Sequence, residues 1–255
     1  MRKTVIEYAA DHAASNPEKV AVMTPGDSVS YGVLYEYARG YAKHLVSSGL
    51  KRGGIVVLRA SQTIEYAIQY LGIHLAGGVV TSLGRTVSDN ELIGVAKSID
   101  AAAIIVDDAL ADEAWSAISM PLGNVREIAS EHVHDSVDLR FPALTDPADI
   151  LFTTGTTGAT KGVELSHRAL VATAENLIFG CEYKDDTVMV VPGPLNHANA
   201  IRKLYTTLVN GSTVYLLNGV ADAKPFFSVL DNADRPVACC LPPAAIRKIF
   251  HLTKD

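Results

Sequence analysis

Short apolar runs alternate along the chain with longer stretches whose apolar residues recur every three or four positions. The short runs, rich in Val and Ile, predict buried strands, and the longer stretches predict amphipathic helices. Strands are expected at residues 20–23, 55–58, 79–81, 102–106, 150–152, 188–191, 213–217 and 237–241. Strands that alternate with helices over nearly the whole length predict an α/β fold with doubly wound, mostly parallel sheets and helices on both faces.

Two helix starts carry a capping-box pattern, in which a hydroxyl residue precedes a glutamate by three positions. Thr4 and Glu7 form the first pair, and Ser88 and Glu91 form the second. Further helices are expected from Ser30, at 64–75, 166–179, 196–209, 225–230 and 242–251.

Residues 107–147 show no regular pattern, and the polar cluster 130–138 is the best candidate for a boundary. We therefore expect internal halves at about 1–145 and 146–255. The sequence stops soon after its last expected helix, which would leave a sheet edge exposed. We expect a fragment of a longer chain, and the alternative is a small complete domain.

Composition narrows the class of protein. With 22 Lys and Arg against 28 Asp and Glu, the chain has a net charge of −6, which argues against nucleic acid as a partner. Three cysteines, two of them adjacent, do not form a disulfide framework. No signal peptide or membrane span is evident, so a soluble, cytoplasmic protein is expected.

The strongest chemical signal is a loop rich in Thr and Gly that follows the strand at 150–152 and ends near Lys161. Glycines let backbone N–H groups approach an anion, threonine hydroxyls donate to phosphate oxygens, and the lysine adds a compact positive charge. The loop therefore predicts a polyphosphate site, and the alternative is a solvated turn. It fits neither the Walker pattern nor the dinucleotide fingerprint.

This loop resembles the phosphate-binding signature Thr-Ser-Gly-Thr-Thr-Gly-x-Pro-Lys-Gly of the adenylate-forming superfamily. Thr154 stands for the Ser and Thr160 for the Pro. The resemblance continues in order over nearly the whole chain, at 30–34, 72–80, 165–167, 194–197 and 211–214. The stretch 78–83 looks more like acyl- or aryl-CoA ligases than peptide-synthetase domains.

The resemblance implies particular roles for particular residues. His197 would lie at the mouth of the carboxylate pocket, near the α-phosphate. The β- and γ-phosphates of ATP would be held by Thr153, Thr154, Gly155, Thr156, Thr157, Gly158 and Lys161. The implied small molecules are a small carboxylic acid, ATP, Mg²⁺ with its ligand beyond residue 255, and coenzyme A as co-substrate.

The implied activity is ATP-dependent formation of an acyl-adenylate with release of pyrophosphate, followed by transfer to coenzyme A. The resemblance covers only part of an N-terminal adenylation domain, without the C-terminal lid, so we expect this chain alone to be inactive. Three alternatives remain: a non-catalytic nucleotide- or acyl-adenylate-binding module, a peptide-synthetase-type fragment, and an unrelated phosphotransferase.

Other polar residues are predicted to be structural. His167 is interpreted as a cap or packing residue, and Cys239 and Cys240 as small buried hydrophobes. Arg202 and Lys203 are interpreted as part of a solvated helix face, and the alternative is a docking point for an acidic acyl group. No metal site is predicted within the chain.

Overall fold

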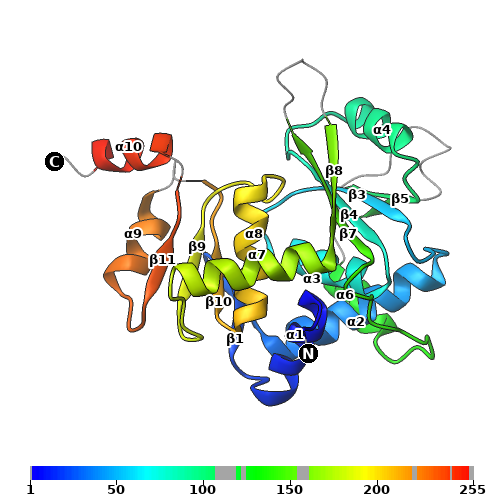
Figure 1. The fold of residues 1–255 in the computed structure, drawn as a ribbon, viewed down its shortest axis with the longest axis horizontal. Coiled ribbons are helices and arrows are strands. Elements are labelled where there is room, and N and C mark those ends of the chain that lie inside the picture. Colours follow the sequence, from blue (N-terminus) through cyan, green and yellow to red (C-terminus); the bar gives the residue numbers. More distant parts are fainter. Residues whose placement is uncertain are drawn as a thin grey trace.

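The computed structural model describes residues 2–106, 119–121, 125–153, 161–219, 223–241 and 243–252. Two sheets, each flanked by helices, make up the fold, which confirms the predicted α/β class (Figure 1). The five-stranded sheet has the order β11 (Val237–Cys239), β9 (Val188–Val191), β10 (Thr213–Leu216), β1 (Val20–Thr24), β2 (Asp27–Ser30). The six-stranded sheet has the order β6 (Ser119–Pro121), β5 (Ala103–Val106), β3 (Ile55–Arg59), β4 (Val79–Leu83), β7 (Pro147–Thr153), β8 (Lys161–Ser166).

The helices of the described chain connect these strands. They are α1 (Val5–Ser15), α2 (Tyr31–Ser47), α3 (Ile64–Leu75), α4 (Asp89–Ser98), α6 (Val125–His132), α7 (His167–Gly180), α8 (Ala198–Asn210), α9 (Ala223–Asp231) and α10 (Pro243–Leu252). All eight predicted strands are present, with small differences at their ends. Both predicted capping boxes are confirmed, because Thr4 and Ser88 each exchange hydrogen bonds with the glutamate three positions later.

Alternate residues of the central strands face different cores, as two-sided burial requires. In β3, Val56 packs in the main core and Val57 in a smaller core beneath α4. In β9, Met189 packs in the main core and Val190 packs against α9 and α10. The main core also contains the buried faces of α1, α2, α3, α7 and α8, so these helices lie between the two sheets (Figure 1).

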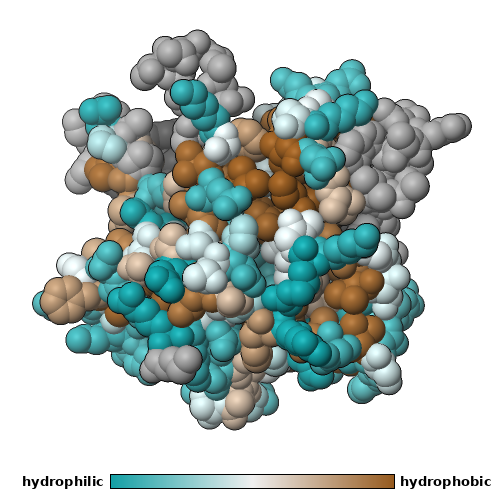
Figure 2. All heavy atoms as spheres, turned by 45° about the vertical axis from the view of Figure 1, so that its right-hand side comes forward, coloured by the Kyte–Doolittle hydropathy of each residue, from teal (hydrophilic) through white to brown (hydrophobic). Residues whose placement is uncertain are grey.

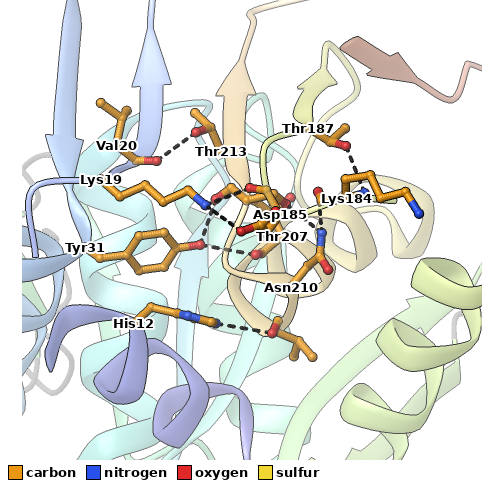
Figure 3. Close-up of polar contacts among 12 residues, drawn as sticks. His12, Lys19, Val20, Tyr31, Lys184, Asp185, Thr187, Thr207, Asn210 and Thr213 are labelled. Atoms are coloured by element: carbon orange, nitrogen blue, oxygen red, sulfur yellow. Dashed lines mark hydrogen bonds and ion pairs between the residues drawn. The ribbon is translucent and has the colours of Figure 1, made fainter. Parts of the chain in front are cut away.

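The start of the chain is tied to its later half by polar contacts (Figure 3). The hydroxyl of Tyr31 donates to the carbonyl oxygens of Thr207 and Ser212, at 3.2 and 2.7 Å. Lys19 donates to the carbonyl oxygen of Asp185 at 2.8 Å. These contacts place β1 beside β10, to which it pairs in parallel.

The two sheets do not divide at residue 146. β1 and β2 share the five-stranded sheet with β9–β11, whereas β7 and β8 complete the six-stranded sheet. The polar cluster 130–138 is an ordered surface segment, because Nδ1 of His132 lies 2.6 Å from Oδ2 of Asp135 and Nε2 lies 3.1 Å from Nδ1 of His44.

The pattern missed β2, β6, α6 and β8. β8 is an edge strand with four exposed residues in succession, including Val163 with 45% exposure. Such a strand is held by its hydrogen bonds to β7 and not by apolar burial, so it leaves little hydrophobic signal.

The surface combines charged and apolar areas. Figure 2 shows apolar side chains gathered in the upper centre of the face that it brings forward, with hydrophilic groups around them. No helix in the described ranges has both the length and the apolar character needed to cross a bilayer.

Candidate active site

The predicted phosphate loop is framed by the hairpin of β7 and β8. The two strands pair antiparallel, and their register ends with Thr153 opposite Lys161. The two residues that border the loop are therefore neighbours across the hairpin, with the Lys161 side chain exposed. The other predicted loop residues, Thr154, Gly155, Thr156, Thr157 and Gly158, lie outside the described residues.

A buried polar network holds β7 in place. Asp149, which is 1% exposed, accepts a 2.9 Å hydrogen bond from the hydroxyl of Tyr70, and its Oδ1 lies 3.0 Å from Nε2 of His74. Burial, with the nearby Asp149 carboxylate as a second cause, raises the pKa of Tyr70, so this hydroxyl stays protonated and can donate. The network has no access to solvent, and it fixes the strand that leads into the loop.

His167 extends the same network by ring packing. It is the first residue of α7, is 1% exposed, and its ring lies edge-on to His74 with the centroids 4.8 Å apart. Burial, with smaller contributions from His74 and Arg52, lowers the pKa of His167 to about 2. The packing role predicted for His167 is confirmed.

A cavity of about 350 Å³ lies where the carboxyl ends of strands from both sheets meet. Ligands of open α/β sheets bind at this edge. Three segments line the cavity. Arg59 ends β3 and residues 60–63 form the loop after it, Arg85 lies in the loop after β4, and Asn218 lies two positions after β10. Sequence reasoning missed these residues, although their place directly after predicted strands was visible.

Gln62 connects this cavity to the loop between β9 and α8. Its Nε2 donates a 2.7 Å hydrogen bond to the carbonyl oxygen of Gly193. In the same loop, the amide nitrogen of the Asn196 side chain lies 3.6 Å from the point where Gly84 would carry a Cβ. The loop therefore lies beside Arg85 at the rim of the cavity.

His197 ends this loop and is the N-cap of α8. Its side chain is exposed and makes no capping hydrogen bond, while its backbone N–H donates to the carbonyl oxygen of Pro194 at 3.0 Å. Because β4 and β7 are parallel neighbours, the loop after β4 and the hairpin tip lie at the same edge of the six-stranded sheet. The fold thus gathers Lys161, the cavity and His197 at the carboxyl ends of the strands.

The interpretation of Lys203 as solvated was wrong. Lys203 is 4% exposed, and its Nζ donates to the carbonyl oxygens of Asn199 and Cys240 and to Oδ1 of Asn199, at 3.0, 2.8 and 3.1 Å. Burial lowers its pKa. Arg202 is half-buried, and its Nη2 reaches the same Asn199 Oδ1 at 3.3 Å. The prediction of a solvated face failed because α8 is buried on nearly every side, so most of its polar residues do not face solvent.

The interpretation of the adjacent cysteines was also wrong in part. Cys239 is half-buried against the core beneath α9, but Cys240 is exposed. In the described ranges, no three His, Cys, Asp or Glu side chains are grouped so that they could hold a metal ion.

Comparisons with known proteins identify what the chain is similar to. A family model described as AMP-binding enzyme matches residues 9–255. A 4-coumarate–CoA ligase-like protein 1 of Arabidopsis thaliana is 31% identical over 270 residues, covering 99% of this chain and 48% of the relative. A malformin synthetase of Aspergillus brasiliensis is also 31% identical, covering 84% of this chain and 4% of the relative.

Solved structures share the fold. Apo MatB from Rhodopseudomonas palustris superposes with a TM-score of 0.85 at 21% identity, covering 98% of this chain and 51% of that one. The N-terminal subdomain of Klebsiella oxytoca NpsA, solved with 3-hydroxybenzoyl-AMSN, superposes with a TM-score of 0.85 at 20% identity. The match covers 99% of this chain and 63% of that one. The chain spans less than half the length of the curated relatives it matches.

Proposed function

The chain belongs to the AMP-binding enzyme family of adenylate-forming ligases, and from this premise we propose that it supplies the triphosphate- and acid-binding part of an AMP-forming acid–thiol ligase. The observation that carries the proposal is the β7–β8 hairpin, whose register sets Thr153 opposite Lys161 at the carboxyl edge of the sheet. This pairing supports the assignment of the Thr- and Gly-rich segment between the two strands to phosphate binding.

In the first step, a carboxylate oxygen of the acid attacks the α-phosphorus of ATP. The bond between that phosphorus and the bridging oxygen breaks, and pyrophosphate leaves with the electron pair. The protein holds the reactants in line and stabilises the negative charge that develops on the leaving group. Lys161 and the hydroxyls and amides of the Thr153–Gly158 segment are assigned to that task, and His197 is assigned to the neighbourhood of the reacting carboxylate.

In the second step, a thiolate sulfur attacks the acyl carbon, the bond from that carbon to the phosphate oxygen breaks, and AMP leaves. We propose coenzyme A as the thiol. The relative from Arabidopsis thaliana, whose name describes a CoA ligase, supports this choice over most of the chain, as does the similarity of residues 78–83 to CoA ligases. The malformin synthetase match keeps a peptide-synthetase-type acceptor as the alternative, for which pyrophosphate release would be the same.

Direct nucleotide binding tests the first step. We expect ATP to bind the chain, as measured by isothermal titration calorimetry, and Lys161→Ala to weaken that binding about tenfold because a charge-assisted contact to phosphate is lost. The matched control is Lys51→Ala, which removes an exposed lysine that precedes β3 at the opposite edge of the sheet. ATP binding that Lys161→Ala leaves unchanged would contradict the assignment.

Isotope exchange between pyrophosphate and ATP tests the reaction itself. In the full-length protein, exchange is expected to require a carboxylic acid and to fall sharply in Lys161→Ala. Consumption of the acyl-adenylate with release of AMP on addition of coenzyme A, but not on addition of a carrier-protein thiol, would support the acyl-CoA branch. A protein that binds ATP but shows no exchange with any acid would be the non-catalytic module.

A further inference from the structure

We propose that Arg202 forms a subsite for a second anionic group on the acid, so that the substrate is a short-chain dicarboxylic acid. This inference rests on the proposed function and names the substrate class of the same site. The residues that carry it are Arg202, Lys203 and Asn199, on the first turns of α8.

Arg202 and Lys203 carry positive charge that no carboxylate of the described chain balances. Two cations lie side by side on α8, and both donate to one amide oxygen, Oδ1 of Asn199. Neither is within ion-pair distance of a carboxylate among the described residues. An amide oxygen compensates no net charge, and buried cations are normally paired with anions.

Three of the neighbouring ionisable groups do not supply the missing anion. Tyr183 and Tyr205 both lie near Arg202, and burial raises the pKa of each phenol well above its ordinary value. Burial likewise raises the pKa of the Cys239 thiol to about 11. These three groups are therefore neutral at pH 7 and do not balance the positive charge of the pair.

The two cations differ in how far their hydrogen-bonding capacity is filled. The ammonium of Lys203 has three protons and three acceptors, so its hydrogen-bonding capacity is filled within the protein. By contrast, Nε of Arg202 is buried without a hydrogen-bond partner in the described structure. A guanidinium has five donors in a planar fork that matches a carboxylate. Arg202 is only half-buried and its hydrogen-bonding capacity is not filled, so we assign it as the group that contacts the ligand. Lys203 adds to the positive electrostatic potential beside it.

The N-terminal end of α8 is open to solvent. His197, Ala198 and Asn199 are exposed at the start of α8, whereas most of the helix is buried. The N-terminal N–H groups of α8 receive no side-chain cap from His197, and a helix N-terminus favours negative charge. This open end of α8 belongs to the same carboxyl edge as the cavity, as the contact from Lys203 to the carbonyl oxygen after β11 shows.

The axial spacing of His197 and Arg202 gives a lower bound on the length of the acid. Arg202 follows His197 by five residues, which is about 7.5 Å along a helix axis at 1.5 Å per residue. An acid whose first carboxylate lies beside His197 could therefore reach the Arg202 side chain with its second carboxylate across a short carbon chain. An acid with an apolar tail would instead leave the guanidinium desolvated and unpaired, which is costly.

Calorimetric titration of the chain with paired acids, in the presence of ATP, tests the proposal. The dicarboxylates from malonate to adipate are compared with monocarboxylates of equal carbon number. We expect the best dicarboxylate to bind at least about tenfold more tightly than the monocarboxylate of equal carbon number. One charge-assisted hydrogen-bonded pair contributes enough binding free energy for a change of this size. Arg202→Gln should abolish the difference, and Arg202→Lys should restore part of it.

The control variant is Arg140→Gln, which removes an arginine whose side chain is 80% exposed and pairs with Asp138. It should leave the preference unchanged. The preference should also appear as a lower KM for the dicarboxylate in pyrophosphate exchange by the full-length protein, with Arg202→Gln raising that KM more than it lowers kcat.

The outcomes separate this inference from the proposed function. If ATP binds but dicarboxylates and monocarboxylates bind equally, or if Arg202→Gln weakens both classes alike, the subsite is overturned and the proposed function stands. If inorganic sulfate competes as well as every dicarboxylate regardless of length, the pair is a general anion site and the substrate class is overturned. If ATP does not bind, both proposals are overturned.

Discussion

The carboxylate of Asp149 and the imidazole of His74 lie 3.0 Å apart in the interior, and both side chains are at most 2% exposed. Asp149 is on β7, four residues before the predicted phosphate loop, and His74 is near the end of α3. Their contact joins the loop-bearing strand to a helix of the main core. The stability of the hairpin therefore depends on a polar pair that has no direct access to a ligand.

Replacing His74 with Leu is expected to lower the free energy of unfolding by about 3 kcal/mol or more, because the buried Asp149 carboxylate loses a partner that water cannot replace. Urea denaturation followed by circular dichroism measures the change. The control is Arg140→Gln at the exposed pair with Asp138, which should cost less than about 0.5 kcal/mol. Similar effects from the two variants would show that the buried pair is not important to stability.

Low pH is expected to destabilise the folded protein through protonation of His167 in the unfolded chain. The pKa of this ring is lowered to about 2 by burial, whereas an unfolded histidine titrates near 6.5. Between these values the unfolded chain binds a proton that the folded chain does not. The free energy of unfolding is therefore unaffected above about pH 6.5 and falls by up to about 1.4 kcal/mol per pH unit below it.

Unfolding in urea at pH 7.5, 6.0 and 5.0 measures this slope. His44, whose pKa is also lowered by burial, contributes a slope of the same sign. His167→Phe should reduce the slope by about one proton, whereas His134→Asn, at an exposed position, should not. An unchanged slope in His167→Phe would mean that His167 is not the group that titrates.

The Tyr31 hydroxyl is expected to contribute to the docking of the N-terminal segment. Tyr31→Phe removes the donor to two carbonyl oxygens in the buried region shown in Figure 3, and should cost about 1–3 kcal/mol. Tyr35→Phe, on the same helix but only half-buried, is the matched control and should cost less than about 0.5 kcal/mol. Equal midpoints in thermal unfolding would contradict the assigned role.

Two helical glycines should respond in opposite directions to alanine. A Cβ on Gly40 of α2 would lie 1.8 Å from the backbone oxygen of Ala129, so Gly40→Ala must displace α6 and should cost about 3 kcal/mol or more. Gly94 of α4 has nothing within 4 Å, and Gly94→Ala should stabilise by up to about 1 kcal/mol. Thermal denaturation of both variants checks the signs, and a neutral Gly40→Ala would contradict the close approach of α2 and α6.

The sequence by itself determined the local elements, the fold class and the family. Burial on two faces and helical spacing are properties of neighbouring residues, so the strands, the capping boxes at Thr4 and Ser88, and the Thr- and Gly-rich loop could all be recognised from the pattern. The edge strand β8 could not, because its stability comes from pairing with β7.

Only the tertiary structure decided which distant segments meet. The pairing of β1 with β10, the cavity between Arg59 and Asn218, and the burial of Lys203 against Cys240 each join residues from different elements. Such contacts depend on how the two sheets pack around the central helices, and the local sequence does not encode that arrangement in any short pattern. For the same reason the sequence predicts that Lys203 is solvated, whereas in the folded chain it is buried and donates to the carbonyl oxygen of Cys240, directly after β11.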